Sequence, residues 1–229
     1  MDVGRVLGVQ LPPPGALVDT GVVTEIQLAS LWDDAYAQGE STRSWFEADP
    51  AMSLRMIDAA GSAAHASVVD VGGGTSRLVD SLLARGHHDV TVVDISEAAL
   101  HIAQERLGQD AAQVTWIHTD ICAWSPARVF DVWHDRAVMH FLTSVGDQRR
   151  YRRALDAASR PGTVAVFGCF ASDGPTHCSG LPVVRRDPPE LAEFLGAEWS
   201  LVAQDRELHA TPGGAVQPFT WAAFVRIRP

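Results

Sequence analysis

The chain has 229 residues, of which 46% are hydrophobic and 20% are charged. This length and composition suit one soluble globular domain with a sizeable core. The formal net charge of −10 argues against general affinity for nucleic acid or anionic membranes, so we expect neither as a partner. The arginines between 149 and 153 have helical spacing and are best interpreted as a solvated helix face.

The three cysteines, Cys122, Cys169 and Cys178, cannot all pair with one another, and none stands in a C-x-x-C spacing. We therefore expect neither a disulfide framework nor a zinc knuckle, and we predict no metal site. The apolar stretch Val6–Leu11 is too short for the core of a signal peptide, and no run approaches the ~20 apolar residues that span a bilayer. These features predict a cytoplasmic protein in a reducing compartment.

The chain is expected to begin with a loose lead-in at residues 1–20, followed by a helical region. The sequence favours a first helix from 22 to 38. Asp49 and Pro50 supply an N-cap and a first-turn proline for a second helix, which Gly61 can end. This region is therefore predicted to be a helical cover for the remainder of the domain.

Beyond this cover, short apolar runs alternate with helical stripes. Strands are expected at 66–71, 90–93, 114–118, 130–134 and 163–170. The helical stripes between them fall at 78–83, 99–107 and 151–158. Strands and helices that alternate at this spacing predict a doubly wound parallel sheet with helices on both of its faces.

The pattern changes after Phe170. A short helix is expected at 188–195, and two strands are expected at 199–203 and 219–227, joined by a turn-rich segment. These strands resemble a terminal antiparallel hairpin, so the predicted fold class is α/β with a mostly parallel seven-stranded sheet. The predicted division of the chain is a lead-in at 1–20 and a single domain at 21–229, with its cover at 21–61 and its core at 62–229.

A glycine-rich loop follows the first predicted strand, in the sequence DVGGGTS. Ligands of open α/β sheets bind at the carboxyl ends of the strands, and glycines allow close approach of the backbone. A dinucleotide fingerprint, G-x-G-x-x-G, would need its third glycine where Arg77 stands. Asp70 is poorly suited to a pyrophosphate and well suited to a cationic amino group. The candidate cofactor-binding residues of this loop are Asp70, Gly72, Gly73, Gly74 and Ser76.

Two further acids close the next two strands. Asp94 can accept hydrogen bonds from both hydroxyls of a ribose. Asp120 can accept a hydrogen bond from an adenine amine, although a cap after the strand explains it equally well. With their neighbours Ile95 and Ile121, which can pack near the ring, these acids complete the predicted cofactor site.

Together these motifs resemble the class I S-adenosylmethionine-dependent methyltransferases, over about residues 32–224. The segment VVDVGGGTS is similar to the first motif of that superfamily, VVDIS to its ribose-binding acid, HTDI to its adenine-side acid and RPGTVAVFG to its fifth strand. The resemblance implies S-adenosylmethionine as cofactor and S-adenosylhomocysteine as product. One departure is Ser76, where the superfamily usually has its third glycine.

A narrower resemblance concerns the fourth strand. The segment FDVWHDRAVMHFL, with LWDDAYAQG and SWFEADP upstream, is similar to the branch that contains citrate synthase and elongation-factor lysine methyltransferases. That branch has an Asp-Lys-Gly type sequence where this chain has Asp135, Arg136 and Ala137. The resemblance makes a protein lysine a candidate acceptor beside a small molecule.

Residues on the acceptor side are expected after strands four and five. We predict Asp135 and His140 as catalytic, while Asp135 has an alternative role as a partner of Arg136 or a helix cap. His134 is interpreted as a satisfied buried histidine. The loop after strand five offers further candidates in Asp173, His177 and Cys178. Tryptophans at 32, 45, 116, 124 and 133 predict an aromatic-lined pocket.

The leading hypothesis is methyl transfer to a nitrogen, oxygen or sulfur atom of a small molecule. Alternatives are a protein lysine methyltransferase and a non-catalytic S-adenosylmethionine-binding module, which Ser76 and the lack of an obvious base would suit. An oxidoreductase on the same sheet is disfavoured by Arg77. The sequence leaves the acceptor atom and the oligomeric state open.

Overall fold

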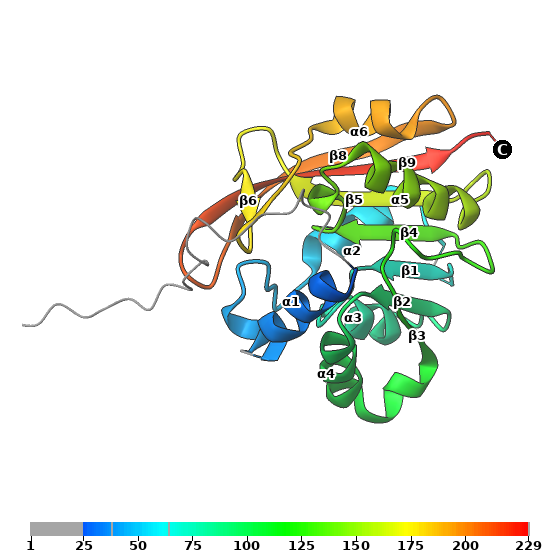
Figure 1. The fold of residues 1–229 in the computed structure, drawn as a ribbon. Helices are drawn as coiled ribbons and strands as arrows, with labels where there is room; N and C mark the ends of the chain where they lie inside the picture. The colour runs from blue at the N-terminus through cyan, green and yellow to red at the C-terminus, as the bar shows by residue number, and fades with distance from the viewer. Residues whose placement is uncertain (1–24, 38, 64, 229) are drawn as a thin grey trace, which may run out of the picture.

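The computed structural model describes residues 25–37, 39–63 and 65–228, and these form one seven-stranded sheet in the order β3-β2-β1-β4-β5-β9-β8 (Figure 1). The strands are β1 Val68–Val71, β2 Val90–Asp94, β3 Val114–His118, β4 Val132–Arg136, β5 Val164–Phe170, β8 Trp199–Ala210 and β9 Val216–Arg226. The first five are parallel, whereas β9 runs antiparallel to both β5 and β8. The predicted fold class is confirmed; the predicted lead-in at 1–20 lies outside the described residues.

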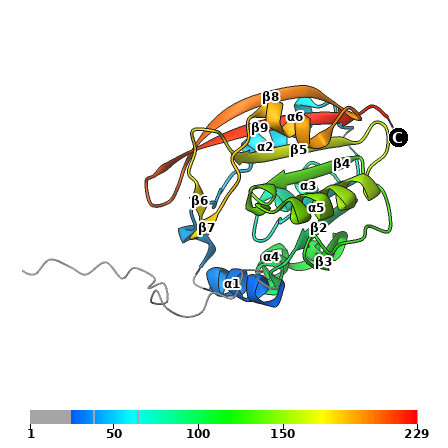
Figure 2. The ribbon, with the colours of Figure 1, turned by 45° about the horizontal axis from the view of Figure 1, so that its top comes forward.

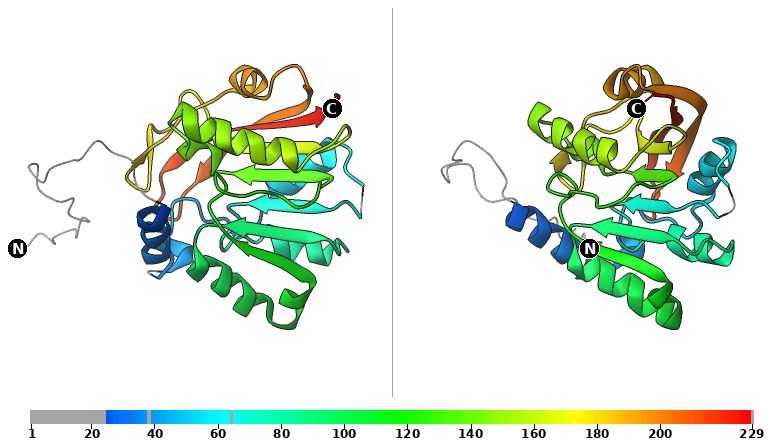
Figure 3. Two further views of the ribbon diagram at one scale, coloured as in Figure 1. Left: turned by 45° about the vertical axis from the view of Figure 1, so that its right-hand side comes forward. Right: turned by 90° about the vertical axis from the view of Figure 1, so that its right-hand side faces the viewer.

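Helices cover both faces of this sheet, as Figure 3 shows. The α-helices are α1 Glu25–Ala37, α2 Ala51–Ala59, α3 Leu78–Ala84, α4 Glu97–Leu107, α5 Val145–Ala157 and α6 Pro188–Leu195. Three 3₁₀ turns, η1 Glu40–Thr42, η2 Gly108–Gln113 and η3 Met139–Phe141, lie between them. Buried side chains of α2, α3 and α4 form one core with the sheet, and those of α5 and α6 form a second core on the opposite face. No helix within the described ranges is long and apolar enough to cross a membrane.

The strands bury both faces because apolar residues occupy successive positions. In β1, Val68 packs in the α2–α3 core, while Val69 and Val71 pack in the α5–α6 core. Successive side chains of a strand point to opposite faces, so a central parallel strand needs such a continuous apolar run. A polar residue within such a run must find a partner or face a ligand, and Asp70 in β1 is such a residue.

Several element boundaries differ from the sequence-based prediction, among them the starts of β4 and α2. The strand β4 was expected at 130–134, but its pairing with β1 begins only at Val132. The Asp131 carboxylate instead accepts hydrogen bonds from the backbone and hydroxyl of Ser67, which holds this residue in the loop before β4. The helix α2 has Pro50 at its N-cap with no side-chain cap bond, so the predicted cap at Asp49 is wrong by one residue.

The hairpin of β8 and β9 is longer than predicted. The strand β8 runs for 12 residues, but most of its side chains beyond Ala203 are polar, so the apolar pattern that marks a strand is missing there. Backbone pairing with β9, from Trp199 with Arg226 to Ala210 with Val216, defines it instead. A two-stranded hairpin, β6 His177–Cys178 and β7 Leu181–Pro182, lies in the loop after β5 and was not predicted.

The carboxyl ends of the parallel strands face the side on which α1 and the β6–β7 hairpin lie (Figures 1 and 2). One contact fixes α1 there: Asp33 Oδ1 accepts hydrogen bonds from the Ser96 hydroxyl, at 2.6 Å, and from the Ala98 backbone, at 3.2 Å. Asp33 and Ser96 thus share the amino end of α4, because the Ser96 hydroxyl itself caps the backbone of Ala99. The cover is anchored directly above the strand ends.

Candidate active site

A cavity lies at the carboxyl ends of the parallel strands, beneath α1. One part, here called the glycine-loop half, is lined by Gly72, Gly73, Asp94, Ile95, Asp120 and Ile121. The other part, here called the cover half, is lined by Trp32, Trp45, Phe46, Glu47, Arg136 and Phe141. Asp70 and His134 line the cavity between them. The structure therefore brings the loops after three strands and the N-terminal cover to one cavity.

The glycine loop needs its glycines for packing. Gly72 has a φ of +64°, and a Cβ there would overlap the Val138 side chain. A Cβ at Gly73 would lie 2.7 Å from Asp70 Oδ2 and equally close to Val92 Cγ1. Gly74, with a φ of +48°, lies behind the lining, where a Cβ would approach the Tyr36 hydroxyl to 2.6 Å. A side chain at any of these positions would clash with its neighbours and change the shape of the loop that lines the cavity.

Ser76 both lines the cavity and begins α3, since its hydroxyl accepts a hydrogen bond from the Leu78 backbone at 3.1 Å. Arg106 of α4, which sequence reasoning missed, holds the same loop. Its guanidinium donates to the carbonyls of Thr75 and Ser76 at 2.9 and 2.8 Å and is paired with Asp80 at 2.7 Å. Arg106 lies on α4, 30 positions after Ser76 in the sequence, so no local motif indicates this contact.

Asp94 is buried at the end of β2, with its Oδ1 accepting a hydrogen bond from the Ser96 backbone at 2.8 Å. Burial raises the pKa of its carboxyl to about 6, against the opposing effect of backbone hydrogen bonds from Ser96 and Gly74. The same carboxylate and burial raise the pKa of the adjacent Tyr36 hydroxyl well above its usual value. Asp94 thus stands ready as a hydrogen-bond acceptor in a water-poor part of the cavity.

Asp120 combines the two roles left open by the sequence. Its Oδ1 accepts a hydrogen bond from the Cys122 backbone at 2.8 Å, which caps the turn after β3. The residue also lines the cavity together with Ile121 and Ile95. The acids at the ends of β1, β2 and β3 therefore reach one cavity, as predicted.

Asp70 and His134 form a buried pair on neighbouring strands. The register aligns them across β1 and β4, and His134 Nδ1 lies 2.7 Å from Asp70 Oδ1. Their side chains are 3% and 2% exposed. Asp70 Oδ2 and His134 Nε2 have no hydrogen-bond partner among the described residues. The predicted satisfied histidine is therefore half satisfied, because its buried Nε2 has no hydrogen-bond partner among the described residues.

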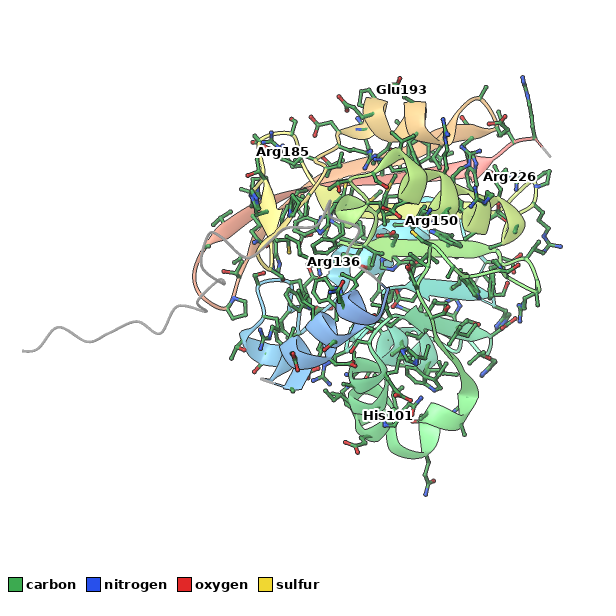
Figure 4. The ribbon with its side chains drawn as sticks, viewed as in Figure 1. His101, Arg136, Arg150, Arg185, Glu193 and Arg226 are labelled. Carbon is green, nitrogen blue, oxygen red and sulfur yellow. The ribbon has the colours of Figure 1, made fainter. Side chains whose placement is uncertain are left out.

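The cover half is held together by Arg136, at the end of β4 (Figure 4). Its guanidinium donates to the Trp45 carbonyl at 2.9 Å, forms an ion pair with Glu47 at 2.8 Å and lies 5.0 Å above the ring of Phe219. Burial raises the pKa of the Glu47 carboxyl to about 7; Arg136 opposes this shift, and Glu207 adds to it. Arg136 thereby fastens the cover to the sheet.

Ligand atoms of Glu47, Glu207 and His209 lie within 4.8 Å of one another, which is the spacing of a metal site. Each already has a protein partner. Arg136 pairs with Glu47, the Trp221 indole donates to Glu207 at 2.7 Å, and His209 Nε2 lies 2.8 Å from the Ser44 carbonyl. A guanidinium beside Glu47 supplies the positive charge that a cation would otherwise bring, so we assign no metal here.

The two predicted catalytic residues lie outside the lining of the cavity. Asp135 points to the α5 face of the sheet, where it accepts hydrogen bonds from the Tyr151 hydroxyl at 2.6 Å and from the backbones of Val138 and Met139. His140 is fully buried in η3, between rings at 4.4 and 4.8 Å, and burial lowers its pKa to about 3. Asp135 therefore shapes the turn after β4, and neither side chain is brought to the site.

Other predicted residues divide between cavity and surface. Cys178 lines the cavity, while Asp173 is exposed in an ion pair with Arg206 and His177 is exposed in β6. The predicted aromatic lining is present in Trp32 and Trp45 but is absent for the other three tryptophans, 116, 124 and 133.

Comparison with known proteins finds a matching family model and similar solved structures. Residues 68–162 match the family model described as a methyltransferase domain. This part of the chain is therefore similar to known methyltransferase domains. The prediction of an S-adenosylmethionine-dependent methyltransferase is confirmed at this level, while the match carries no information on the acceptor or on the lysine methyltransferase branch. No curated protein matches the chain in sequence.

Several solved structures share the fold. One, from work on conversion of a disulfide bond into a thioacetal group during echinomycin biosynthesis, has a TM-score of 0.68 and 20% identity, covering 87% of this chain and 93% of that chain. The 1,6-didemethyltoxoflavin-N1-methyltransferase of Burkholderia thailandensis, solved with 1,6-didemethyltoxoflavin and S-adenosylhomocysteine, has a TM-score of 0.68 and 21% identity over 92% and 93%. N-methyltransferase NodS from Bradyrhizobium japonicum WM9, in complex with S-adenosyl-l-homocysteine, has a TM-score of 0.65 and 15% identity over 85% and 97%. At these identities the likeness establishes the fold.

The residues of the cavity fit S-adenosylmethionine, which carries an ammonium, a sulfonium, a ribose and an adenine. The unpartnered Oδ2 of Asp70 is buried beside the glycine loop, at 2.7 Å from where a Cβ of Gly73 would lie. Asp94 and Asp120 follow at the next strand ends. Three carboxyl groups facing one cavity suit a cation and disfavour the pyrophosphate of a dinucleotide.

Proposed function

We propose that the protein transfers a methyl group from S-adenosylmethionine to a nitrogen, oxygen or sulfur atom of a small molecule. The observation that carries the proposal is the single cavity in which a glycine loop with three acids meets an aromatic, covered half. When bound, the cofactor supplies a methyl group already activated by its positive sulfur. The protein's main task is then to align the acceptor and exclude water.

Each half of the cavity has its own role in this proposal. Asp70 accepts hydrogen bonds from the ammonium of the cofactor, Asp94 from the ribose hydroxyls and Asp120 from the adenine amine. Because Gly72 and Gly73 have no side chains, the backbone of their loop can approach the cofactor closely. The flanking Ile95 and Ile121 pack on the adenine, while Gly74 and Ser76 shape the loop. The acceptor lies in the cover half.

A small acceptor is favoured by how the cover is attached. Trp45 is bound to Arg136 through its carbonyl, and α1 is bound to α4 through Asp33, so two segments of the cover close over the strand ends. Trp32 packs edge to face against Trp45 and Phe141 there, with 5.6 and 5.1 Å between ring centroids, so aromatic rings line the cover half. Two of the solved structures described above are of N-methyltransferases, one of them with 1,6-didemethyltoxoflavin bound.

Incubation with radiolabelled S-adenosylmethionine and a fractionated cell lysate tests this proposal. Label in low-molecular-weight compounds is the expected result. Label in protein would favour the lysine alternative. A chain that binds the cofactor yet forms no S-adenosylhomocysteine would be the non-catalytic module, whereas turnover that disappears in Asp70→Ala would exclude that module.

A further inference from the structure

The buried pair of Asp70 and His134 has the arrangement of an oriented base. A carboxylate oxygen 2.7 Å from Nδ1 holds the Nδ1–H tautomer of the ring, because a carboxylate can only accept. The lone pair of the neutral ring then lies on Nε2, which has no partner among the described residues and belongs to a residue that lines the cavity. An orienting acid, a fixed ring and a free nitrogen are the elements of general-base catalysis.

The fold holds this ring in one position. His134 sits in the middle of β4, hydrogen-bonded between β1 and β5, so its backbone cannot shift alone. On the neighbouring strands, Gly168 leaves room for Trp221, since a Cβ there would lie 2.8 Å from the indole. The indole lies tilted by 31° near the imidazole, with 6.2 Å between ring centroids. A ring packed in this way has little freedom to rotate.

The other titratable groups of the lining are already engaged or placed elsewhere. Glu47 is paired with Arg136, and Glu40 is paired with Arg77 at 3.0 Å. Burial raises the pKa of the Cys178 thiol, which keeps it neutral. Asp94 and Asp120 belong to the glycine-loop half. His134 is the lining residue, among those described, that combines a free basic nitrogen with an orienting partner.

We propose that His134 is the general base of the reaction and that the acceptor is a planar ring compound whose nucleophile enters as an N–H or O–H. This inference rests on the proposed function and names its substrate class. The acceptor gives its proton to Nε2 and forms a bond to the methyl carbon, and the electron pair of the broken carbon–sulfur bond remains on sulfur. Flat rings of Trp32, Trp45 and Phe141 line the space for a planar acceptor.

Asp70 then links the two halves of the cavity. Its Oδ1 holds His134, and its Oδ2 faces the glycine loop, where the ammonium of the cofactor is proposed to bind. The charged and titratable groups on the elements around His134 are Asp70, Asp94, Asp135, Arg136, Glu47 and Glu207.

The first test needs no acceptor. Calorimetry with S-adenosylhomocysteine establishes binding, and long-range ¹H–¹⁵N spectra of the histidine rings, with His134→Gln to assign the signal, then report the tautomer. We expect His134 in the wild-type complex to carry its proton on Nδ1 at pH 8. A proton on Nε2 at pH 8 would overturn the inference. Failure of S-adenosylhomocysteine to bind would instead overturn the proposed function.

The second test uses the small-molecule fraction of the lysate as acceptor. We expect His134→Gln to lower the initial rate of label transfer by about 100-fold or more, the usual contribution of a general base. Its affinity for S-adenosylhomocysteine should remain within about threefold of the wild type, and its residual rate should lose the wild-type rise with pH. A variant that folds, binds and transfers label within threefold of the wild-type rate would contradict the assignment. His101→Gln, an exposed change on α4, is the matched control (Figure 4).

Discussion

The two halves of the cavity are built in different ways. The glycine-loop half comes from loops that directly follow β1, β2 and β3, and each acid stands within a few residues of a strand end. The cover half is joined by contacts between distant segments, such as the one from Arg136 to Trp45, 91 positions apart. The topology of the sheet alone places the first half, whereas the second depends on how individual side chains pair. We therefore expect the first half to determine the cofactor and the second to determine the acceptor.

The largest effect should come from filling the glycine loop. Gly73→Ala would place a methyl group 2.7 Å from Asp70 Oδ2 and Val92 Cγ1, both on the rigid sheet. We expect the loop to relieve this overpacking, about 2 kcal/mol, by leaving the shape that binds the cofactor. Affinity for S-adenosylhomocysteine, measured by calorimetry, should then fall by about 30-fold. Gly146→Ala is the control, because its nearest neighbour would lie at 3.6 Å. Equal affinities of the two variants would show that the loop does not contact the cofactor.

A loss of comparable size is expected at the end of β2. Asp94→Asn keeps the shape of the buried side chain but removes its charge, so hydrogen bonds from a ribose weaken by about 1.5–3 kcal/mol, or roughly 10- to 100-fold in affinity. The exposed Asp110→Asn, on η2, provides the matched control and should bind as the wild type does. Unchanged affinity in Asp94→Asn would place the ribose elsewhere.

The affinity for S-adenosylhomocysteine should depend on pH through the carboxyl group of Asp94. The pKa of Asp94 is raised to about 6, and hydrogen bonds donated by ribose hydroxyls favour its ionised form. Affinity for S-adenosylhomocysteine should therefore fall by about tenfold as the pH is lowered from about 7 to about 5. The Asp94→Asn variant should lose this dependence. A pH dependence that persists in the variant would assign it to another group.

The smallest effect on binding is expected from the opposite face of the sheet. Tyr151→Phe removes the hydroxyl that donates to Asp135 and accepts from the Trp133 indole, and leaves both without that partner in the core. The free energy of unfolding should fall by about 1–3 kcal/mol, as thermal denaturation would show. Affinity for S-adenosylhomocysteine should change less than threefold. A loss of more than tenfold in affinity at unchanged stability would return Asp135 to the site.

Much of the fold could be predicted because it depends on local patterns. Apolar runs mark the central strands, and β3 was predicted at its observed bounds of Val114–His118. The hairpin β8–β9 could be predicted only in part, because backbone pairing holds β8 together where its side chains are polar. The β6–β7 hairpin, two residues in each strand, is too short to have an apolar period.

The residues of the site, like the fold, could be predicted only where a local pattern marks them. The acids Asp70, Asp94 and Asp120 follow strands and were predicted from that position. The catalytic candidates Asp135 and His140 were chosen from residue type and sequence position, but the alternation of β4 turns Asp135 toward α5 and brings its neighbour His134 to the cavity. The strand was predicted to end at His134 but runs to Arg136, so Asp135 belongs to the strand and not to the loop after it. Arg106 and Glu47 act through tertiary contacts that no local motif encodes.

The most direct test of the central claim is calorimetric titration of the wild-type chain with S-adenosylhomocysteine, S-adenosylmethionine and NAD. The three acids around the cavity predict that both sulfur compounds bind at one site per chain and that NAD, with its negative pyrophosphate, does not. Binding of NAD, or of none of the three, would contradict the assignment of this cavity to S-adenosylmethionine.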